Sequence, residues 1–331
     1  MSLKAPTIIN PTSHSAYVLA RATTDTSNCT KITPECPVEL TTYGYYPNLG
    51  GNTFFLIFFL FLFIAQVYLG KRNKTWSYTL ALSTGTLFEV LGYIGRLIMH
   101  KNPWSSGGFI IQMLFLIVGP CFIAASIYLT LKHFITYCGP QYSPLRPTLY
   151  PWLFVGCDVG SIVLQAIGGG VASAGTGGGK NSIAQLGNHI MVAGIVFQVV
   201  TMGICGALLA IYIFRYQTNK RGKQQPQSRS PYDESKANGT VSRPKLKAFA
   251  VVLIAAYFFV LIRCIYRIPE LAGGWGNSLM RIEKEFLILD GMMMALATLL
   301  LTVFYPSYYF PPFAAFRIDK HSSLSSDQIP L

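Results

Sequence analysis

Residues 52–70 read NTFFLIFFLFLFIAQVYLG and contain no charged side chain. An apolar run of about 20 residues matches the hydrocarbon thickness of a bilayer, about 30 Å. Similar runs follow at 78–99, 108–131, 150–173, 188–214, 246–267 and 286–307. Only helices and closed barrels satisfy their backbone hydrogen bonds in lipid, and these runs are too long for barrel strands. The sequence therefore predicts an all-α polytopic membrane protein, a bundle of seven transmembrane helices.

The composition agrees with a membrane environment. Of the 331 residues, 51% are hydrophobic and 12% are charged, whereas soluble domains carry about 25% charged residues. The net charge is +13, which in a soluble protein would suggest a nucleic-acid partner. Here Lys and Arg lie mainly between the apolar runs, so membrane topology explains the charge, and we expect no nucleic-acid partner.

Lys and Arg are most frequent on one side of the predicted bundle. The segment 215–247 alone holds nine of them. Cytoplasmic loops carry the excess of Lys and Arg, so this side is predicted to be cytosolic. The sequence then divides into an extracellular tail at 1–48, a transmembrane domain at 49–310 with the cytosolic loop 215–247, and a cytosolic tail at 311–331.

The predicted tails and loop carry features of their own. Asn28 begins the sequence Asn-Cys-Thr, an acceptor pattern for N-glycosylation on the outer side. Cys29 and Cys36 can form a disulfide if the tail is extracellular, and can equally stay reduced. The basic, polar loop 215–247 is typical of a flexible segment and can contact anionic lipid headgroups. Alternatively, its charge only sets the topology.

Ionisable and polar side chains interrupt several of the apolar runs. A charge at the bilayer centre costs at least about 2.5–3.5 kcal/mol, so such residues usually face the bundle interior. Glu89, Tyr93 and Arg96 are spaced to share one helix face. They form either a site or an internal ion pair, with Arg96 extending to the interface as a further alternative. Arg263 and Asp290 fall in adjacent antiparallel helices and can pair.

The fourth run carries a polar stripe of Asp158, Ser161 and Gln165. A carboxyl group in a low dielectric without a cation favours its protonated form. Asp158 is therefore a candidate for proton coupling, or a hydrogen-bonding partner of a neighbouring helix. Gly156 and Gly160 on the same helix are spaced to let another helix approach closely.

Gln112 and Gln198 add polar groups in the third and fifth runs. Together with the ionisable residues they predict one water-filled chamber in the outer half of the bundle, open to the exterior. Such a chamber suits the headgroup of an amphiphile, although structural packing explains the same pattern. Pro120 removes one helical hydrogen bond and is expected to kink its helix.

The same residues resemble a known family, the fungal lipid-translocating exporters, also called RTA-like or aminocholesterol-resistance proteins. The resemblance covers residues 40–310 approximately and rests on several motifs in order: Tyr43-Gly44-Tyr45 with Pro47, Glu89 to Arg96, Gln112 to Tyr128, Asp158 to Gly170, Arg263 to Arg267 with Glu270, and Glu285 with Asp290. It implies a seven-span fold and the export or flipping of lipid-like amphiphiles. Sphingoid long-chain bases, toxic sterols and porphyrins are the implied substrate classes, and the plasma membrane or a related endomembrane the implied location.

The leading hypothesis is a translocase of amphipathic lipids that contributes to resistance and to membrane lipid asymmetry. The predicted substrate-binding residues are Glu89, Tyr93, Arg96, Gln112, Gln165, Gln198, Arg263 and Asp290, and the predicted partners are membrane lipids and amphipathic small molecules. The alternative is a lipid-sensing receptor or regulator that signals to a cytosolic protein through 215–247, because the layout is that of seven-span receptors.

A metal-dependent lipid hydrolase is the third class considered. Catalytic zinc needs three protein ligands. His14 and His321 lie in the tails, and His100, His133 and His189 lie at the ends of different runs, so three cannot easily converge. The sequence predicts no enzyme activity, no metal and no cofactor, while a porphyrin contact by His100 or His189 stays open.

Overall fold

The structure is a computed structural model that describes residues 29–34, 36–177, 181–222, 243–273 and 277–309. Asn28, residues 223–242 of the loop and the tail 311–331 lie outside the described residues. The long helices are α2 (Leu49–Asn73), α3 (Trp76–Lys101), α4 (Ser106–Cys138), α5 (Leu149–Gly177), α6 (Asn181–Gly222), α8 (Arg243–Ala272) and α10 (Met293–Val303). The short helices are η1 (Val38–Leu40), η2 (Pro140–Tyr142), α9 (Glu283–Glu285) and α11 (Pro306–Tyr309), with a π-helical turn, η3 (Phe286–Met292), between α9 and α10.

Six segments have both the length and the composition of a membrane span: Leu49–Asn73, Ser106–Thr136, Leu149–Gly175, Ser182–Thr218, Leu246–Ala272 and Glu283–Tyr308. The protein is therefore an integral, multi-pass helical membrane protein. Helix α3 is not among the six, although its 26 residues are long enough to cross. It carries Glu89, Arg96 and several Ser and Thr residues, which lower its hydropathy. A membrane crossing by α3 stays a prediction, as does the orientation of the bundle.

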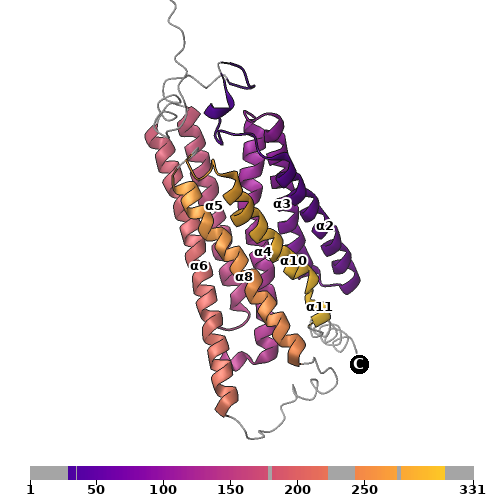
Figure 1. The fold of residues 1–331 in the computed structure, drawn as a ribbon. Coiled ribbons are helices and arrows are strands. Elements are labelled where there is room, and N and C mark those ends of the chain that lie inside the picture. The colour runs from indigo at the N-terminus through magenta and orange to yellow at the C-terminus, as the bar shows by residue number, and fades with distance from the viewer. Residues whose placement is uncertain (1–28, 35, 178–180, 223–242, 274–276, 310–331) are drawn as a thin grey trace, which may run out of the picture.

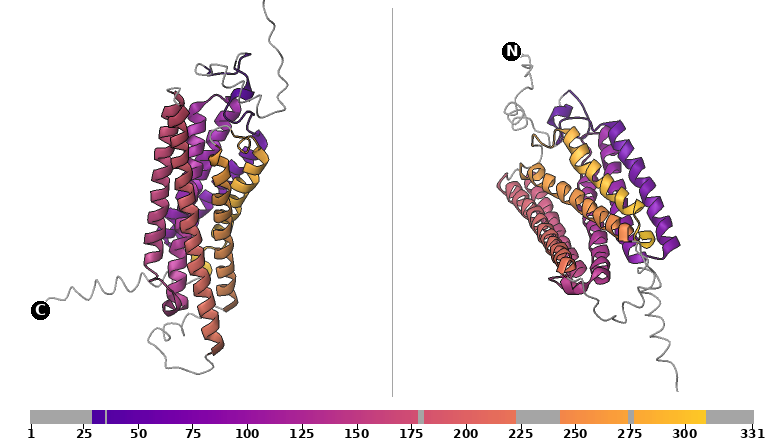
Figure 2. Two further views of the ribbon diagram at one scale, coloured as in Figure 1. Left: turned by 90° about the vertical axis from the view of Figure 1, so that its left-hand side faces the viewer. Right: turned by 60° about the horizontal axis from the view of Figure 1, so that its bottom comes forward.

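The long helices pack as a ring in sequence order (Figures 1 and 2). Helix α2 contacts α3, α3 contacts α4, and the order continues through α5, α6, α8 and α10. Contacts between α10 and α2 close the ring, and α4 also touches α8 across it. Figure 1 shows residues 38–40 at the end of the bundle opposite α11. Side chains from distant parts of the sequence can therefore meet inside the ring.

Helix α2 shows how lipid reverses the usual burial pattern. Its outward residues Phe54, Ile57, Phe61 and Ile64 are exposed, and their spacing of three and four defines one helical face. Its inward face buries the amides Asn52 and Gln66 beside Phe55, Phe59 and Leu62. The Gln66 amide donates to Thr302 Oγ1 over 2.9 Å. The bundle thus exposes apolar side chains and keeps its polar groups inside.

The close approach between α5 and α6 does not use Gly156 and Gly160, the pair that the sequence predicts for helix packing. Gly156 and Gly160 face open space, so the proposed close approach at this pair is wrong. The contact forms further along α5, where a side chain at Gly168 would overlap the backbone of Met191 and one at Gly187 would overlap that of Ala172. The residue spacing was suitable at both places, but only the rotation of α5 within the ring decides which glycines face α6.

Candidate functional site

Arg96 is fully buried in α3 and joins three parts of the chain. Its Nε donates to Asn52 Oδ1 of α2 over 2.7 Å, and its Nη2 lies 3.0 Å from Glu283 Oε1. Nη2 also donates to the Tyr45 hydroxyl over 3.3 Å. The guanidinium carbon lies 4.0 Å from the centre of the Phe286 ring, within cation–π range. The predicted ion pair of Arg96 with Glu89 does not form, because Arg96 pairs with Glu283 instead.

Residues 43–48, which the sequence analysis places in the tail, pack against Arg96. The Tyr43 ring lies 5.5 Å from the Arg96 guanidinium carbon, and its hydroxyl accepts from Gln112 Nε2 over 2.7 Å. Burial raises the pKa values of Tyr43 and Tyr45 above the usual value, so both hydroxyls stay protonated and neutral. Gln112 therefore holds this covering segment onto α4.

Asp290 lies in the π-helical turn η3 and is shared by two arginines of α8. Its Oδ1 lies 2.8 Å from Arg263 Nε and 3.3 Å from Arg267 Nε. Arg267 also pairs with Glu270 over 2.9 Å. Isolated π-helical turns often occur at functional sites. The predicted pairing of Arg263 with Asp290 is confirmed, and Arg267 is buried in the bundle beside them.

Pro120 of α4 contributes indirectly to how Arg263 is held. A proline within a helix lacks the N–H that would donate to the carbonyl four residues earlier, which here is Leu116. The Leu116 carbonyl instead accepts a hydrogen bond from Arg263 Nη2 of α8. Helix α4 runs unbroken from Ser106 to Cys138 through this point. Pro120 thus frees a carbonyl that helps to hold the arginine.

Glu89 is the carboxylate of this region without an ion pair in the described part of the chain. Both carboxylate oxygens are buried and have no hydrogen-bond partner there. Asp290, Arg263 and Arg267 are the charges that act on it. We define the charged cluster as Arg96, Arg263, Arg267, Glu89, Glu270, Glu283 and Asp290. It combines three guanidinium groups with four carboxylates, so one carboxylate lacks a balancing cation.

The cluster is closed, which corrects the predicted chamber open to the exterior. Glu89, Arg96, Arg263 and Asp290 keep 1%, 0%, 3% and 0% of their surface exposed. Tyr93 is also buried and stacks against Phe55 and Phe59 with ring centres 5.4 and 5.7 Å apart. The predicted inward clustering is correct, but these side chains are buried among ion pairs, aromatic rings and residues 43–48 rather than exposed to the exterior.

A second polar group, which we call the Asp158 group, lies between α4, α5 and α6. It comprises Asp158, Tyr128, Cys121, Gln165 and Gln198. Gln165 Nε2 donates to Gln198 Oε1 over 3.2 Å, and Gln198 Nε2 lies 3.1 Å from Cys121 Sγ. The Asp158 carboxylate is buried beside the Tyr128 hydroxyl, with no cationic partner among the described residues. Electrostatic interactions of Cys121 with both Asp158 and Arg263 show that the group adjoins the charged cluster.

Sequence reasoning missed several partners. Asn52 and Glu283 were not selected as site residues, and Tyr43, Tyr45, Arg267 and Glu270 appeared only in the family resemblance. Asn52 had one local signal, an amide at the start of a mostly apolar run. Glu283 had none, because it lies in a short polar segment that reads as an ordinary loop.

Cys29, Cys36 and His100 lie at the same end of the bundle as residues 43–48. Cys29 and Cys36 are joined by a disulfide with Cα atoms 5.8 Å apart, and Trp104 Nε1 donates to the Cys36 carbonyl over 3.2 Å. His100 Nδ1 lies 2.7 Å from the Pro47 carbonyl. Within the described residues, no three His, Cys, Asp or Glu side chains gather as a metal site would require.

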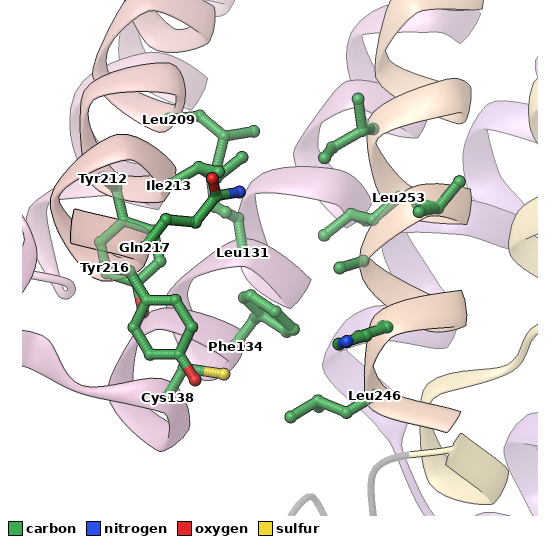
Figure 3. A pocket seen from close by; sticks show the side chains of 14 residues that line it. Leu131, Phe134, Cys138, Leu209, Tyr212, Ile213, Tyr216, Gln217, Leu246 and Leu253 are labelled. Atoms are coloured by element: carbon green, nitrogen blue, oxygen red, sulfur yellow. The ribbon is translucent and has the colours of Figure 1, made fainter. Parts of the chain in front are cut away.

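A groove of about 690 Å³ lies at the opposite end of the bundle, between α4, α6 and α8 (Figure 3). Its walls are mostly apolar, with Leu131 and Phe134 of α4 facing Leu253 of α8. The charged cluster and this groove therefore lie at different depths, and the sequence analysis did not predict the groove.

These features define a class: a multi-pass helical membrane protein with a buried charged cluster inside its ring of helices. Residues 82–312 match the family model described as "RTA1 like protein", and the chain belongs to this family. No solved structure matches the chain.

Three relatives from Saccharomyces cerevisiae illustrate the range of the family. The Sphingoid long-chain base transporter RSB1 is 34% identical, over 81% of this chain and 74% of its own. Protein RTA1 is 27% identical, over 85% of this chain and 88% of its own. Protoporphyrin uptake protein 1 is 28% identical, over 66% of each. The names of two of these relatives describe the movement of amphiphiles.

Proposed function

We propose that the protein translocates amphipathic lipids that bear an amine, such as sphingoid long-chain bases, and that the amine binds at Glu89. The observation that carries the proposal is the excess carboxylate of the charged cluster. Buried charges normally occur in pairs, and Glu89 is the member without one in the described chain. A protonated amine would balance it, and a relative at 34% identity is named for sphingoid-base transport.

The remaining predicted site residues take supporting roles in this proposal. Arg96, Arg263 and Asp290 are engaged in internal pairs, so they hold the cluster together rather than bind substrate, and Arg263 and Asp290 also act on Glu89. Gln112 holds residues 43–48 over the cluster, and opening of this segment would admit a headgroup. Sterol-like drugs and porphyrins are further candidate substrates, with resistance and lipid asymmetry as the cellular outcome.

Orientation and location form part of the same proposal. The end that holds residues 29–48 faces outward and the loop 215–247 faces the cytosol, because Lys and Arg gather at the latter end. The plasma membrane is the proposed location, and glycosylation at Asn28 would fit an outer tail.

Replacement of Glu89 by Gln should lower transbilayer flux of a long-chain base by about tenfold, equal to about 1.4 kcal/mol. The amide keeps the shape but not the charge that balances an ammonium group. The assay is flux of a labelled base in vesicles reconstituted with the purified protein. Glu39→Gln is the matched control, since Glu39 is an exposed carboxylate at the same end.

An N-acetylated base, which has lost its cationic amine, is the control substrate, and its flux should be low and insensitive to Glu89→Gln. Unchanged flux of the amine-bearing base in the Glu89 variant would refute the assigned role. Absence of flux in wild-type vesicles, with ligand-dependent binding of a cytosolic protein to residues 215–247, would instead favour the receptor hypothesis.

Asp158 is proposed as the proton-coupling residue. Because its buried carboxyl group lacks a cationic partner in the described chain, it can take up and release a proton during transport. Asp158→Asn should abolish the response of flux to an imposed pH gradient while leaving flux without a gradient within about twofold, because no ion pair is broken. A gradient response that survives in the variant would exclude this role.

A further inference from the structure

The groove between α4, α6 and α8 is lined almost entirely by segments with the composition of membrane spans, Ser106–Thr136, Ser182–Thr218 and Leu246–Ala272. On α6 it extends from Leu209 to Gln217, about two helical turns or roughly 12 Å. The volume of about 690 Å³ lies within the usual range for ligand sites, roughly 300–1,000 Å³. An apolar groove of this size suits a hydrocarbon chain.

The groove is amphipathic along its length. Leu131, Leu209 and Leu253 line its deeper part, and Figure 3 shows the amide of Gln217 extending from α6 toward α8. Lys247 lines it near the start of α8 and is exposed. No ion pair to Lys247 is found within the described residues. The groove thus has an apolar interior with a cation and an amide donor toward its end.

The surroundings of Lys247 favour an anion. At this end of the bundle the described residues include the cations Lys71, Arg72, Lys74, Lys132, Arg146, Arg215 and Lys247. The described carboxylates lie elsewhere: Asp158 and Glu89 are within the helices, and the others, Glu39, Glu270, Glu283, Glu285 and Asp290, belong to the opposite end. A cationic headgroup would be repelled here, whereas a lipid phosphate would be attracted.

We propose that this groove binds an anionic phospholipid of the surrounding leaflet, with one acyl chain between α4, α6 and α8 and the phosphate beside Lys247 and Gln217. The lipid would connect α8 to α4 and α6 where the apolar surfaces of these helices leave a gap. This site is separate from the charged cluster, and it does not depend on which substrate is transported.

The test uses the full chain in vesicles that contain phosphatidylglycerol with a photoactivatable group in one acyl chain. Crosslinks are mapped by mass spectrometry to residues 131–138, 209–217 and 246–254. Lys247→Ala should lower crosslinking by about fivefold, which corresponds to about 1 kcal/mol for one basic residue at an anionic surface. Lys71→Ala is the matched control, because Lys71 is exposed at the same end on α2 and does not line the groove.

A second variant tests the acyl-chain part of the site. Ala250→Trp places a large side chain in the groove and should lower crosslinking at all three segments. If the tryptophan variant misfolds, Lys247→Ala still tests the proposal. Three results would overturn the proposal: equal losses in Lys71→Ala and Lys247→Ala, equal labelling by a phosphatidylcholine probe, or labelling that falls outside the three groove segments.

Discussion

Asp290→Asn is expected to lower the free energy of unfolding by roughly 3–5 kcal/mol, the cost of removing one partner from a buried ion pair. Asp290 Oδ1 faces both Arg263 Nε and Arg267 Nε, at 2.8 and 3.3 Å. The asparagine leaves two buried guanidinium groups with less negative charge to balance them. Because η3 and α8 meet through these contacts, the bundle should loosen where α8 and α10 pack. Thermal unfolding of the purified protein in detergent measures the effect.

Glu285→Gln provides the control for Asp290→Asn. Glu285 is five residues earlier on the same segment and forms no ion pair in the described chain. The double variant Asp290→Asn with Arg263→Gln should recover part of the lost stability, since it removes one of the unbalanced cations. A melting temperature for Asp290→Asn that matches the Glu285 variant would show that Asp290 does not stabilise this region.

Arg96→Met should cost about 3 kcal/mol, near the lower limit for breaking a buried pair. Glu283 keeps 17% of its side chain exposed, so part of its lost interaction is replaced by water. The variant also loses the hydrogen bonds to Asn52 and Tyr45 and the contact with Phe286. Amide hydrogen exchange should therefore accelerate at residues 43–48 and 282–286, and far less along α5 and α6.

Two further substitutions separate charge from geometry at Arg96. Arg96→Lys keeps the positive charge but cannot reproduce the planar, forked donation to Asn52 and Glu283, so it should recover only part of the stability. Lys101→Met is the matched control, because Lys101 is exposed at the end of the same helix. Exchange rates at residues 43–48 that equal the wild-type values in Arg96→Met would contradict the role of Arg96 in holding that segment.

The two largest expected effects fall on residues that organise the cluster rather than on those proposed to carry substrate or protons. Arg96, Arg263, Arg267, Asp290, Glu270 and Glu283 are engaged in ion pairs. Glu89 and Asp158 are not, within the described chain. A buried carboxylate without a cationic partner is costly, so a role in transport best explains why these two positions carry carboxylates. Their variants should change transport more than stability.

Several features of this site follow from the sequence directly. Ionisable residues in long apolar runs must face inward because hydrocarbon cannot solvate them, and Glu89, Arg96, Arg263 and Asp290 are buried as expected. The pairing of Arg263 with Asp290 was also predictable, since consecutive antiparallel helices place them at similar depth. Residue type and depth were sufficient for these predictions because neither depends on how the helices are rotated.

Other features depend on the tertiary structure. Arg96 pairs with Glu283, which is 187 residues away and has no distinguishing local pattern. The carbonyl freed by Pro120 is used by Arg263 of another helix, and Tyr43 of the supposed tail covers the cluster. The sequence alone determined which side chains must avoid lipid, because that cost belongs to each residue. Only the arrangement of helices around the ring decided their partners, and hence that the cluster is closed, because partner choice depends on the rotation and depth of every neighbouring helix.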